Sequence, residues 1–299
     1  MSGRRRTRAV LTGAVAATAV VVLLLRERRL RRCTLHPFLP DELHSLGEGS
    51  RLAARVFSGG GVSPSLRLKV WPLLLMVDAQ LPRQLQKTQG EPSSELVEAL
   101  RVIAVDVPRT RTHSPERLTH LLEDYARTHP SVLYSQGLSE IGAVFIDIFR
   151  DDDAASAAFA AFIHRQRRSF LADIKTGLLR RLLALGELLR VADTAVCARL
   201  RQLGALDCVW ALRPVAVLLL RELGEADAAT LWDVLMAHPD DDYLLYVVAA
   251  AVLSRRRSLL AAHCLDDLLV LVNSLSGTLS IGCLLADAHD LHSRLHATP

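Results

Sequence analysis

The chain has 299 residues, of which 50% are apolar and only 5% aromatic, and β-branched runs bounded by turns are scarce, which argues against a sheet protein and for a helical one. The net charge of +4 is uneven, because residues 1–33 carry nine Arg against one Glu while the remainder carries 27 basic against 31 acidic residues. A mildly acidic body argues against a nucleic-acid-binding domain.

Residues 1–33 form a distinct N-terminal region. Ala9 to Leu25 are 17 residues without a charge, and arginines flank them on both sides. As a helix they span about 25 Å, at the short end for crossing a bilayer. We expect a membrane anchor that holds the following domain in the cytosol, at an organelle that the sequence does not name. A cleaved secretory signal fits less well, since an Arg-rich segment follows in place of small residues, and a mitochondrial presequence is usually less hydrophobic.

Beyond the anchor the sequence predicts one all-α domain. Residues 34–61 are expected to be a connector, because Pro37 and Pro40 interrupt it and three glycines at 59–61 end it. Residues 62–296 show no internal repeat and no long linker, so we assign them to a single domain. Caps, prolines and apolar spacing predict helices from Ser63-Pro64, from near Ser93 or Ser94, from Ser114-Pro115 to about Thr128, over Leu138–Phe149, and over about 154–169, 178–191, 194–203, 206–222, 225–237, 242–253, 258–272 and 278–293.

Residues that often carry chemistry form no self-sufficient site in this sequence. The five cysteines (Cys33, Cys197, Cys208, Cys264 and Cys283) are scattered without a C-x-x-C, so we expect reduced thiols and no zinc site. The acidic triplets 151–153 and 240–242 are expected to be solvated helix starts. The histidines match no metal-binding pattern, and no P-loop or G-x-S-x-G is present. We therefore expect no metal and no cofactor in this chain.

Two polar residues lie in loop contexts on either side of one amphipathic helix. Arg109 follows Pro108 in the segment I-x-x-D-x-x-R-T, which starts at Ile103, and Gln136 lies in Y-S-Q-G, which ends at Gly137. Taken alone, Arg109 is an ordinary surface arginine and Gln136 a turn residue. Together, 27 positions apart and joined by one helix, they resemble the TBC domain of Rab GTPase-activating proteins.

Further segments carry the same resemblance. V-S-P-S-L-R-L-K-V-W at 62–71 is similar to the opening helix of that family, with its L-R-x-x-V-W signature. The stretch from Leu118 to Gly137 is similar to the family segment that ends in Y-C-Q-G-M. A looser likeness covers Ala211 to Leu223 and Leu231-Trp232-Asp233.

The resemblance implies an all-α fold and a GTPase activator that completes the active site of a Rab, not an enzyme on its own. Arg109 would be an arginine finger and Gln136 would act in place of the glutamine of the Rab, while the partner carries GTP and Mg²⁺. We expect Asp106 to orient Arg109 by a charge-assisted hydrogen bond. Ile103 and Tyr134 are expected to be packing residues, and Thr110 and Gly137 complete the two motifs.

Some residues depart from the family pattern. The loop after Arg109 is short, Pro72 lies in the opening helix, Arg213-Pro214 replaces R-W, and Ser135 replaces the usual cysteine. These departures motivate an alternative, a TBC-like scaffold that binds a small GTPase or another partner without activating it. A third possibility is an unrelated helical membrane-associated protein that carries both motifs by chance.

Overall fold

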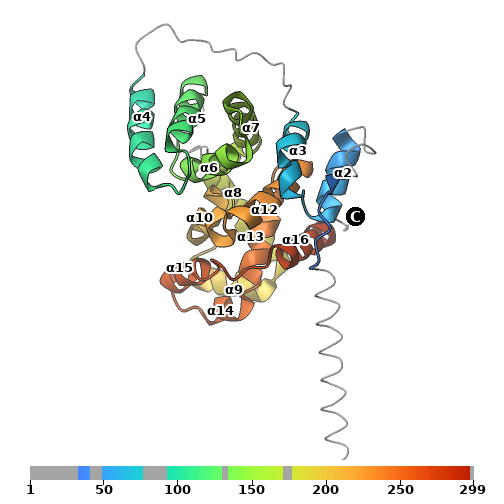
Figure 1. Cartoon of the computed structure of the whole chain (residues 1–299). Coiled ribbons are helices and arrows are strands. Elements are labelled where there is room, and N and C mark those ends of the chain that lie inside the picture. Colours follow the sequence, from blue (N-terminus) through green and yellow to red (C-terminus); the bar gives the residue numbers. More distant parts are fainter. Residues whose placement is uncertain (1–32, 41–48, 77–92, 130–133, 171–176, 297–299) are drawn as a thin grey trace, which may run out of the picture.

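The computed structural model of the chain describes residues 33–40, 49–76, 93–129, 134–170 and 177–296 (Figure 1). In these residues every regular element is a helix, and extended backbone pairs in one isolated parallel bridge between Phe38 and Val62. The predicted all-α fold is confirmed. The predicted membrane anchor at residues 9–25 lies outside the described residues, and none of the described helices has the length and apolar character that a membrane span needs.

The elements of the first half include those that carry the predicted finger residues. Their bounds are α2 (Gly49–Gly59), η2 (Pro64–Leu66), α3 (Arg67–Leu74), α4 (Ser94–Asp106), η3 (Val107–Arg109), α5 (Pro115–Thr128), α6 (Leu138–Ile148), α7 (Asp152–Arg165) and η4 (Arg167–Ser169). Helix α5 packs against α4, α6 and α7, and Figure 1 shows this group at one end of the molecule.

The helices of the second half form the other end. Their bounds are α8 (Leu178–Ala192), α9 (Thr194–Gln202), η5 (Val209–Ala211), α10 (Leu212–Ala216), α11 (Leu220–Leu223), α12 (Glu225–Ala237), α13 (Tyr243–Leu253), α14 (Arg256–Ala261), α15 (Leu265–Asn273) and α16 (Ile281–His296). Helix α13 has the strongest apolar character of these, and it packs against α8, α10, α14 and α16.

An aromatic cluster joins the two halves. Trp71 of α3 lies 5.0 Å, centroid to centroid, from the ring of Phe145 on α6, and Phe162 of α7 lies 5.3 Å from Trp232 on α12. All four side chains are fully buried. Aromatic pairs at these separations add attraction beyond the area they bury, so the finger-bearing helices are fixed to the second half.

Several predicted helix ends are confirmed because local chemistry sets them. The hydroxyl of Ser93 accepts the N–H of Leu96 at the start of α4, and the carboxylate of Asp151 accepts the N–H of Ala154 at the start of α7. Helix α5 ends at Thr128, two residues before Pro130, as the proline predicts.

The predicted continuous helix over 206–222 is wrong. The structure has η5, α10 and α11 there, and Cys208, Leu218 and Leu219 adopt positive φ angles of 55°, 51° and 60°. Left-handed backbone at a non-glycine residue costs about 1–2 kcal/mol. All three side chains are fully buried, and the indole of Trp232 donates to the carbonyl of Leu218 at 3.2 Å, so tertiary packing offsets that cost.

The predicted single helix over 258–272 is also divided, into α14 and α15. The Asp267 side chain accepts the backbone N–H groups of His263 and Cys264, at 2.6 Å and 3.3 Å. This carboxylate caps a new helix start and thereby ends the preceding helix at Ala261.

The predicted connector is part of the folded body. It contains α2, which packs against α12, and residues 36–38 run beside Gly59 and Gly61, with the N–H of Phe38 donating to the carbonyl of Gly61 at 2.9 Å. Apolar residues anchor the segment, since Phe38 and Val56 are fully buried.

The expectation of reduced thiols fails at one pair. Cys33 and Cys283 form a disulfide across 250 residues of sequence, whereas Cys197, Cys208 and Cys264 are free. Gly282 permits this approach, because a Cβ there would lie 1.9 Å from the carbonyl oxygen of Cys33. The pairing depends on how the segment before α2 lies along α16, which spacing in the sequence does not reveal.

Candidate functional site

Arg109 ends the short helix η3, directly after α4. Ile103 and Val107 are buried beneath it, and Pro108 lies in the first turn of η3. The guanidinium of Arg109 is exposed, and within the described part of the chain it forms no ion pair. A cation at the end of a helical segment that packs through Ile103 and Val107 is available to an anion on another molecule.

Gln136 lies in the turn that leads into α6, and its side chain is exposed. The next residue, Gly137, has a φ of +104° and lies at the N-cap of α6. A Cβ at Gly137 would lie 2.6 Å from Cγ1 of Val217. Glycine is therefore required here on two grounds, backbone conformation and the close approach of the segment after α10.

Hydrogen bonds join these two loops. The phenol of Tyr134 donates to Oδ2 of Asp106 at 3.0 Å. The hydroxyl of Thr110 donates to the carbonyl of Asp106 at 2.9 Å and lies 2.8 Å from the hydroxyl of Ser139. The residues on either side of Arg109 are thus tied to the residues on either side of Gln136.

Asp106 has a different partner from the predicted one. Its carboxylate accepts the Tyr134 phenol, and among the described residues no hydrogen bond joins it to Arg109. Asp106 therefore holds the second loop and not the guanidinium. Ile103 is fully buried as expected of a packing residue, whereas Tyr134 both packs against the core and donates this hydrogen bond.

The chemistry of Tyr134 suits a permanent donor. Burial raises the pKa of its phenol above the ordinary value, and the nearby Asp106 carboxylate raises it further. The phenol therefore stays protonated throughout the physiological range, and the link between the loops does not depend on pH there.

A second network fixes α6 from the opposite side. Arg221 of α11 forms an ion pair with Glu140 in the first turn of α6, with Nε of Arg221 lying 3.0 Å from Oε2 of Glu140. The carboxylate also lies favourably at the positive end of the α6 dipole. The helix that follows Gln136 is thus held by both halves of the fold.

Asp233 forms a buried centre that was not predicted. Its carboxylate accepts Nε and Nη2 of Arg67 at 3.2 and 3.0 Å, the indole N–H of Trp71 at 2.5 Å and the backbone N–H of Val62 at 2.9 Å. These contacts unite the L-R-x-x-V-W segment with the W-D segment. An aspartate within the apolar run of α12 was the available signal, and it left the identity of the partner open.

Arg213, which belongs to a departure from the family pattern, stabilises the fold. Nε of Arg213 donates to Oε1 of the fully buried Glu222 at 2.9 Å, and its Nη1 donates to Oδ1 of Asn273 at 2.6 Å. Burial raises the pKa of Glu222 and the Arg213 cation opposes that rise. Arg213 therefore stabilises the turn between α10 and α11, and not the exposed surface.

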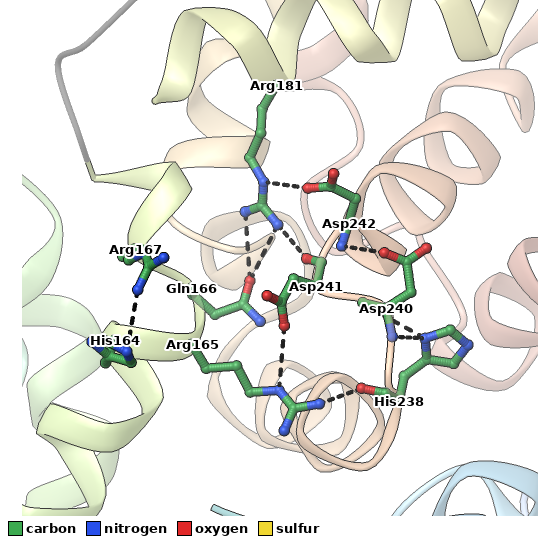
Figure 2. Close-up of polar contacts among 9 residues, drawn as sticks. All are labelled: His164, Arg165, Gln166, Arg167, Arg181, His238, Asp240, Asp241 and Asp242. Atoms are coloured by element: carbon green, nitrogen blue, oxygen red, sulfur yellow. Dashed lines mark hydrogen bonds and ion pairs between the residues drawn. The ribbon is translucent and has the colours of Figure 1, made fainter. Parts of the chain in front are cut away.

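The acidic triplet 240–242 was expected to be a solvated helix start. It does precede α13, but Asp242 has partners. Its Oδ2 accepts Nη1 of Arg168 at 2.9 Å. Its Oδ1 accepts Nε of the buried Arg181 at 3.3 Å, as Figure 2 shows. Within the described residues, the Arg109–Gln136 surface has no cluster of three potential metal ligands.

Comparison with known proteins identifies relatives of this arrangement. A family model described as the Rab-GTPase-TBC domain matches residues 64–261. Rab GTPase-activating protein 22 of Arabidopsis thaliana is 30% identical over 207 residues, which cover 62% of this chain and 38% of that protein. TBC1 domain family member 17 of Homo sapiens is 28% identical over 283 residues, which cover 83% of this chain and 43% of that protein.

A solved structure agrees with the fold. The Ypt/Rab-GAP domain of Gyp1p superposes with a TM-score of 0.68 at 18% sequence identity, covering 83% of this chain and 94% of that chain. The present chain spans about two fifths of the length of the two sequence relatives, 38% and 43%. The likeness thus concerns the helical domain that these proteins share.

Proposed function

The chain belongs to the Rab-GTPase-TBC domain family, and we propose that it accelerates GTP hydrolysis by a Rab-family small GTPase. The observation that carries the proposal is that the Tyr134–Asp106 and Thr110–Ser139 contacts join the two segments that carry the exposed side chains of Arg109 and Gln136. Both side chains are presented on loops fixed at their bases, where a partner protein has access to them.

The chemistry of GTP hydrolysis explains why these two residue types suit the task. Negative charge develops on the transferred phosphoryl oxygens, and a guanidinium placed there stabilises it. The amide of Gln136 would orient the attacking water. Donors held by a packed scaffold need little reorganisation as the reaction proceeds, which is the usual source of such rate gains. In this proposal GTP and Mg²⁺ arrive with the GTPase, in its GTP-bound form.

The predicted anchor at residues 9–25 would place this domain at a membrane. A lipidated Rab on the same membrane would meet it at a raised effective concentration. The proposal therefore includes action at a membrane surface, with the domain on the cytosolic side.

A phosphate-release assay tests the activity. The full chain in detergent or reconstituted vesicles is mixed with GTP-loaded Rab proteins from a broad panel. We expect stimulation of at least one Rab, loss of about 10³-fold or more for Arg109→Ala, and a marked loss for Gln136→Ala. Arg257→Ala alters an exposed arginine on α14 and should leave stimulation unchanged.

A binding measurement beside the hydrolysis assay separates activation from mere binding. The short segment 110–114 between η3 and α5 favours the scaffold alternative, because it limits how far Arg109 can extend into a partner. If the chain binds GTP-loaded Rab but hydrolysis is not stimulated by any member of the panel, the scaffold function replaces the proposed one.

A further inference from the structure

Three residues with metal-binding side chains meet at the C-terminal end of the domain. Asp240 precedes α13, and His292 and His296 lie one turn apart on α16. Each offers one ligand atom, and these atoms lie within 4.8 Å of one another. Because Asp240 is more than 50 positions from the histidines, the sequence pattern did not reveal the group, and no metal was expected.

Hydrogen bonds orient the Asp240 carboxylate. Its Oδ1 accepts the backbone N–H of Asp242 at 2.8 Å, and the backbone N–H of Asp240 donates to Nδ1 of His238 at 3.0 Å (Figure 2). The second oxygen, Oδ2, faces α16 and lies 3.9 Å from Nε2 of His292. That separation is too long for a hydrogen bond, so the two atoms do not pair with each other.

The imidazoles are also oriented. Nδ1 of His296 lies 3.0 Å from the carbonyl oxygen of His292. A carbonyl can only accept, so Nδ1 carries a proton, and Nε2 is the ring atom that would bind a metal. A backbone carbonyl in this position is the usual partner of a metal-binding histidine. The two rings stack with centroids 4.1 Å apart and an interplanar angle of 17°.

A third imidazole lies beside the group. The ring centroid of His238 lies 5.0 Å from that of His292, and its Nδ1 accepts the backbone N–H of Asp240. Neutral imidazoles beside one carboxylate would present electron pairs to a cation.

We propose that Asp240, His292 and His296 bind a divalent transition-metal ion, with Zn²⁺ the best match. Imidazole and carboxylate are ordinary Zn²⁺ ligands, and bonds of about 2.0–2.2 Å place tetrahedral ligand atoms about 3.4 Å apart. Binding would require the three side chains to rotate so that the present separations close to that value. Three protein ligands leave one position for water.

The ion would fasten α16 to the loop before α13. That loop already receives Arg181 of α8, whose Nη2 donates to the carbonyl of Asp241 at 2.5 Å (Figure 2). A metal bound there would connect the last helix of the domain to α8 and α13 together. Figure 1 places α16 and α4 on opposite sides of the molecule, so the site is separate from the Arg109 surface.

Direct metal binding tests the proposal. The full chain is stripped with a chelator, desalted and titrated with Zn²⁺ against a chromophoric competitor. We expect one Zn²⁺ per chain, and an affinity at least about tenfold weaker for His292→Ala and for His296→Ala. Zn²⁺ should raise the melting temperature of the unmodified chain and leave that of the double variant, His292→Ala with His296→Ala, unchanged.

Matched controls address folding and other ligands. His296 is exposed in the last turn of α16, so His296→Ala should melt like the parent chain when no metal is present. His263→Ala and Cys264→Ser alter exposed ligand-type residues elsewhere and should retain the ion. The proposal is overturned if the unmodified chain binds no Zn²⁺, or if the double variant binds it equally well.

Discussion

The phenol of Tyr134 donates a hydrogen bond of 3.0 Å to Oδ2 of Asp106, and this bond spans the gap between the loops of Arg109 and Gln136. It joins the end of α4 to the residues before α6. The relative position of the two proposed fingers therefore depends on a contact that involves neither of them.

Tyr134→Phe removes only the hydroxyl. We expect a loss of about 1 kcal/mol in the free energy of unfolding, since a single hydrogen bond is lost and the ring still packs. We also expect a lower kcat for stimulated GTP hydrolysis, because the two loops lose one of the hydrogen bonds that join them. Phosphate release and urea unfolding measure the two effects.

The control for this variant separates positioning from stability. Thr128→Val removes a hydroxyl that donates to the Asp124 carbonyl at 2.7 Å at the far end of α5. It should cost similar stability without lowering stimulated hydrolysis. Equal loss of hydrolysis in both variants would show that general destabilisation, and not the Tyr134–Asp106 link, sets the rate.

Gly137→Ala should be more damaging than an ordinary glycine substitution. The backbone there has a φ of +104°, and the new Cβ would lie 2.6 Å from Cγ1 of Val217. We expect a cost above about 1 kcal/mol, together with displacement of Gln136 and loss of stimulation. Thermal unfolding and phosphate release measure these outcomes.

Gly204→Ala is the matched comparison for the backbone cost. Gly204 also has a positive φ, of +66°, but a Cβ there would meet no atom within 4 Å. Its substitution should cost only the strain of left-handed backbone, about 1 kcal/mol, and should leave stimulation intact. The difference between the two variants measures the contact with Val217 together with the more extreme φ at Gly137, and no difference would exclude that contact as a constraint.

The sequence predicted several helix ends that local chemistry determines, although it missed the local cap at Asp267. Helix starts at the caps Ser93 and Asp151, and the helix end before Pro130, depend on residues within a few positions of each other. They can therefore be predicted from the sequence alone. The breaks at Leu218 and Leu219 could not be predicted in this way, because leucine favours helix, whereas tertiary contacts such as the hydrogen bond from the Trp232 indole to the Leu218 carbonyl stabilise the turn.

In the candidate site, too, the sequence predicted residues but not the contacts that depend on tertiary packing. Arg109 and Gln136 stand out through motif spacing, but the Tyr134–Asp106 bond depends on how α4, α5 and α6 pack. The union of Arg67 with Asp233 likewise crosses 166 positions. Partners that far apart are chosen by the tertiary fold, so the sequence showed the residues and not their pairing.

The Cys33–Cys283 disulfide predicts the number of free thiols. Denatured but unreduced protein should titrate three thiols, those of Cys197, Cys208 and Cys264, and reduced protein should titrate five. Cys283→Ser should unfold at a lower temperature than the oxidised parent, because its free energy of unfolding is lower by about 2–5 kcal/mol. Five thiols before reduction would restore the expectation of reduced cysteines.

The buried pair of Arg67 and Asp233 should respond strongly to loss of the cation. Arg67→Met keeps much of the side-chain volume but leaves the fully buried carboxylate without its counter-ion. We expect a cost of about 3–5 kcal/mol near neutral pH, because an uncompensated charge remains in the core. Urea unfolding measures the cost, and a loss below that of Tyr134→Phe would contradict it.

The pH dependence of that variant follows from the titration of Asp233. Burial raises the pKa of this carboxyl from 3.8 to about 6, against the opposing Arg67 cation. A folded-state pKa above the unfolded one means that the folded chain retains a proton that the unfolded chain releases. The contribution of Asp233 to stability is therefore greatest below about pH 4 and falls as the pH rises to about 6.

Loss of the Arg67 cation removes the influence that lowers the pKa of Asp233, so Arg67→Met should extend this decline above pH 6. We expect the variant to be closer to the parent in stability at pH 5 than at pH 8, since its carboxyl is neutral at the lower pH. Arg67→Met combined with Asp233→Asn should lose the difference, because the titrating group is gone. An unchanged gap between the parent and Arg67→Met at the two pH values would place the cost in lost packing and not in the buried charge.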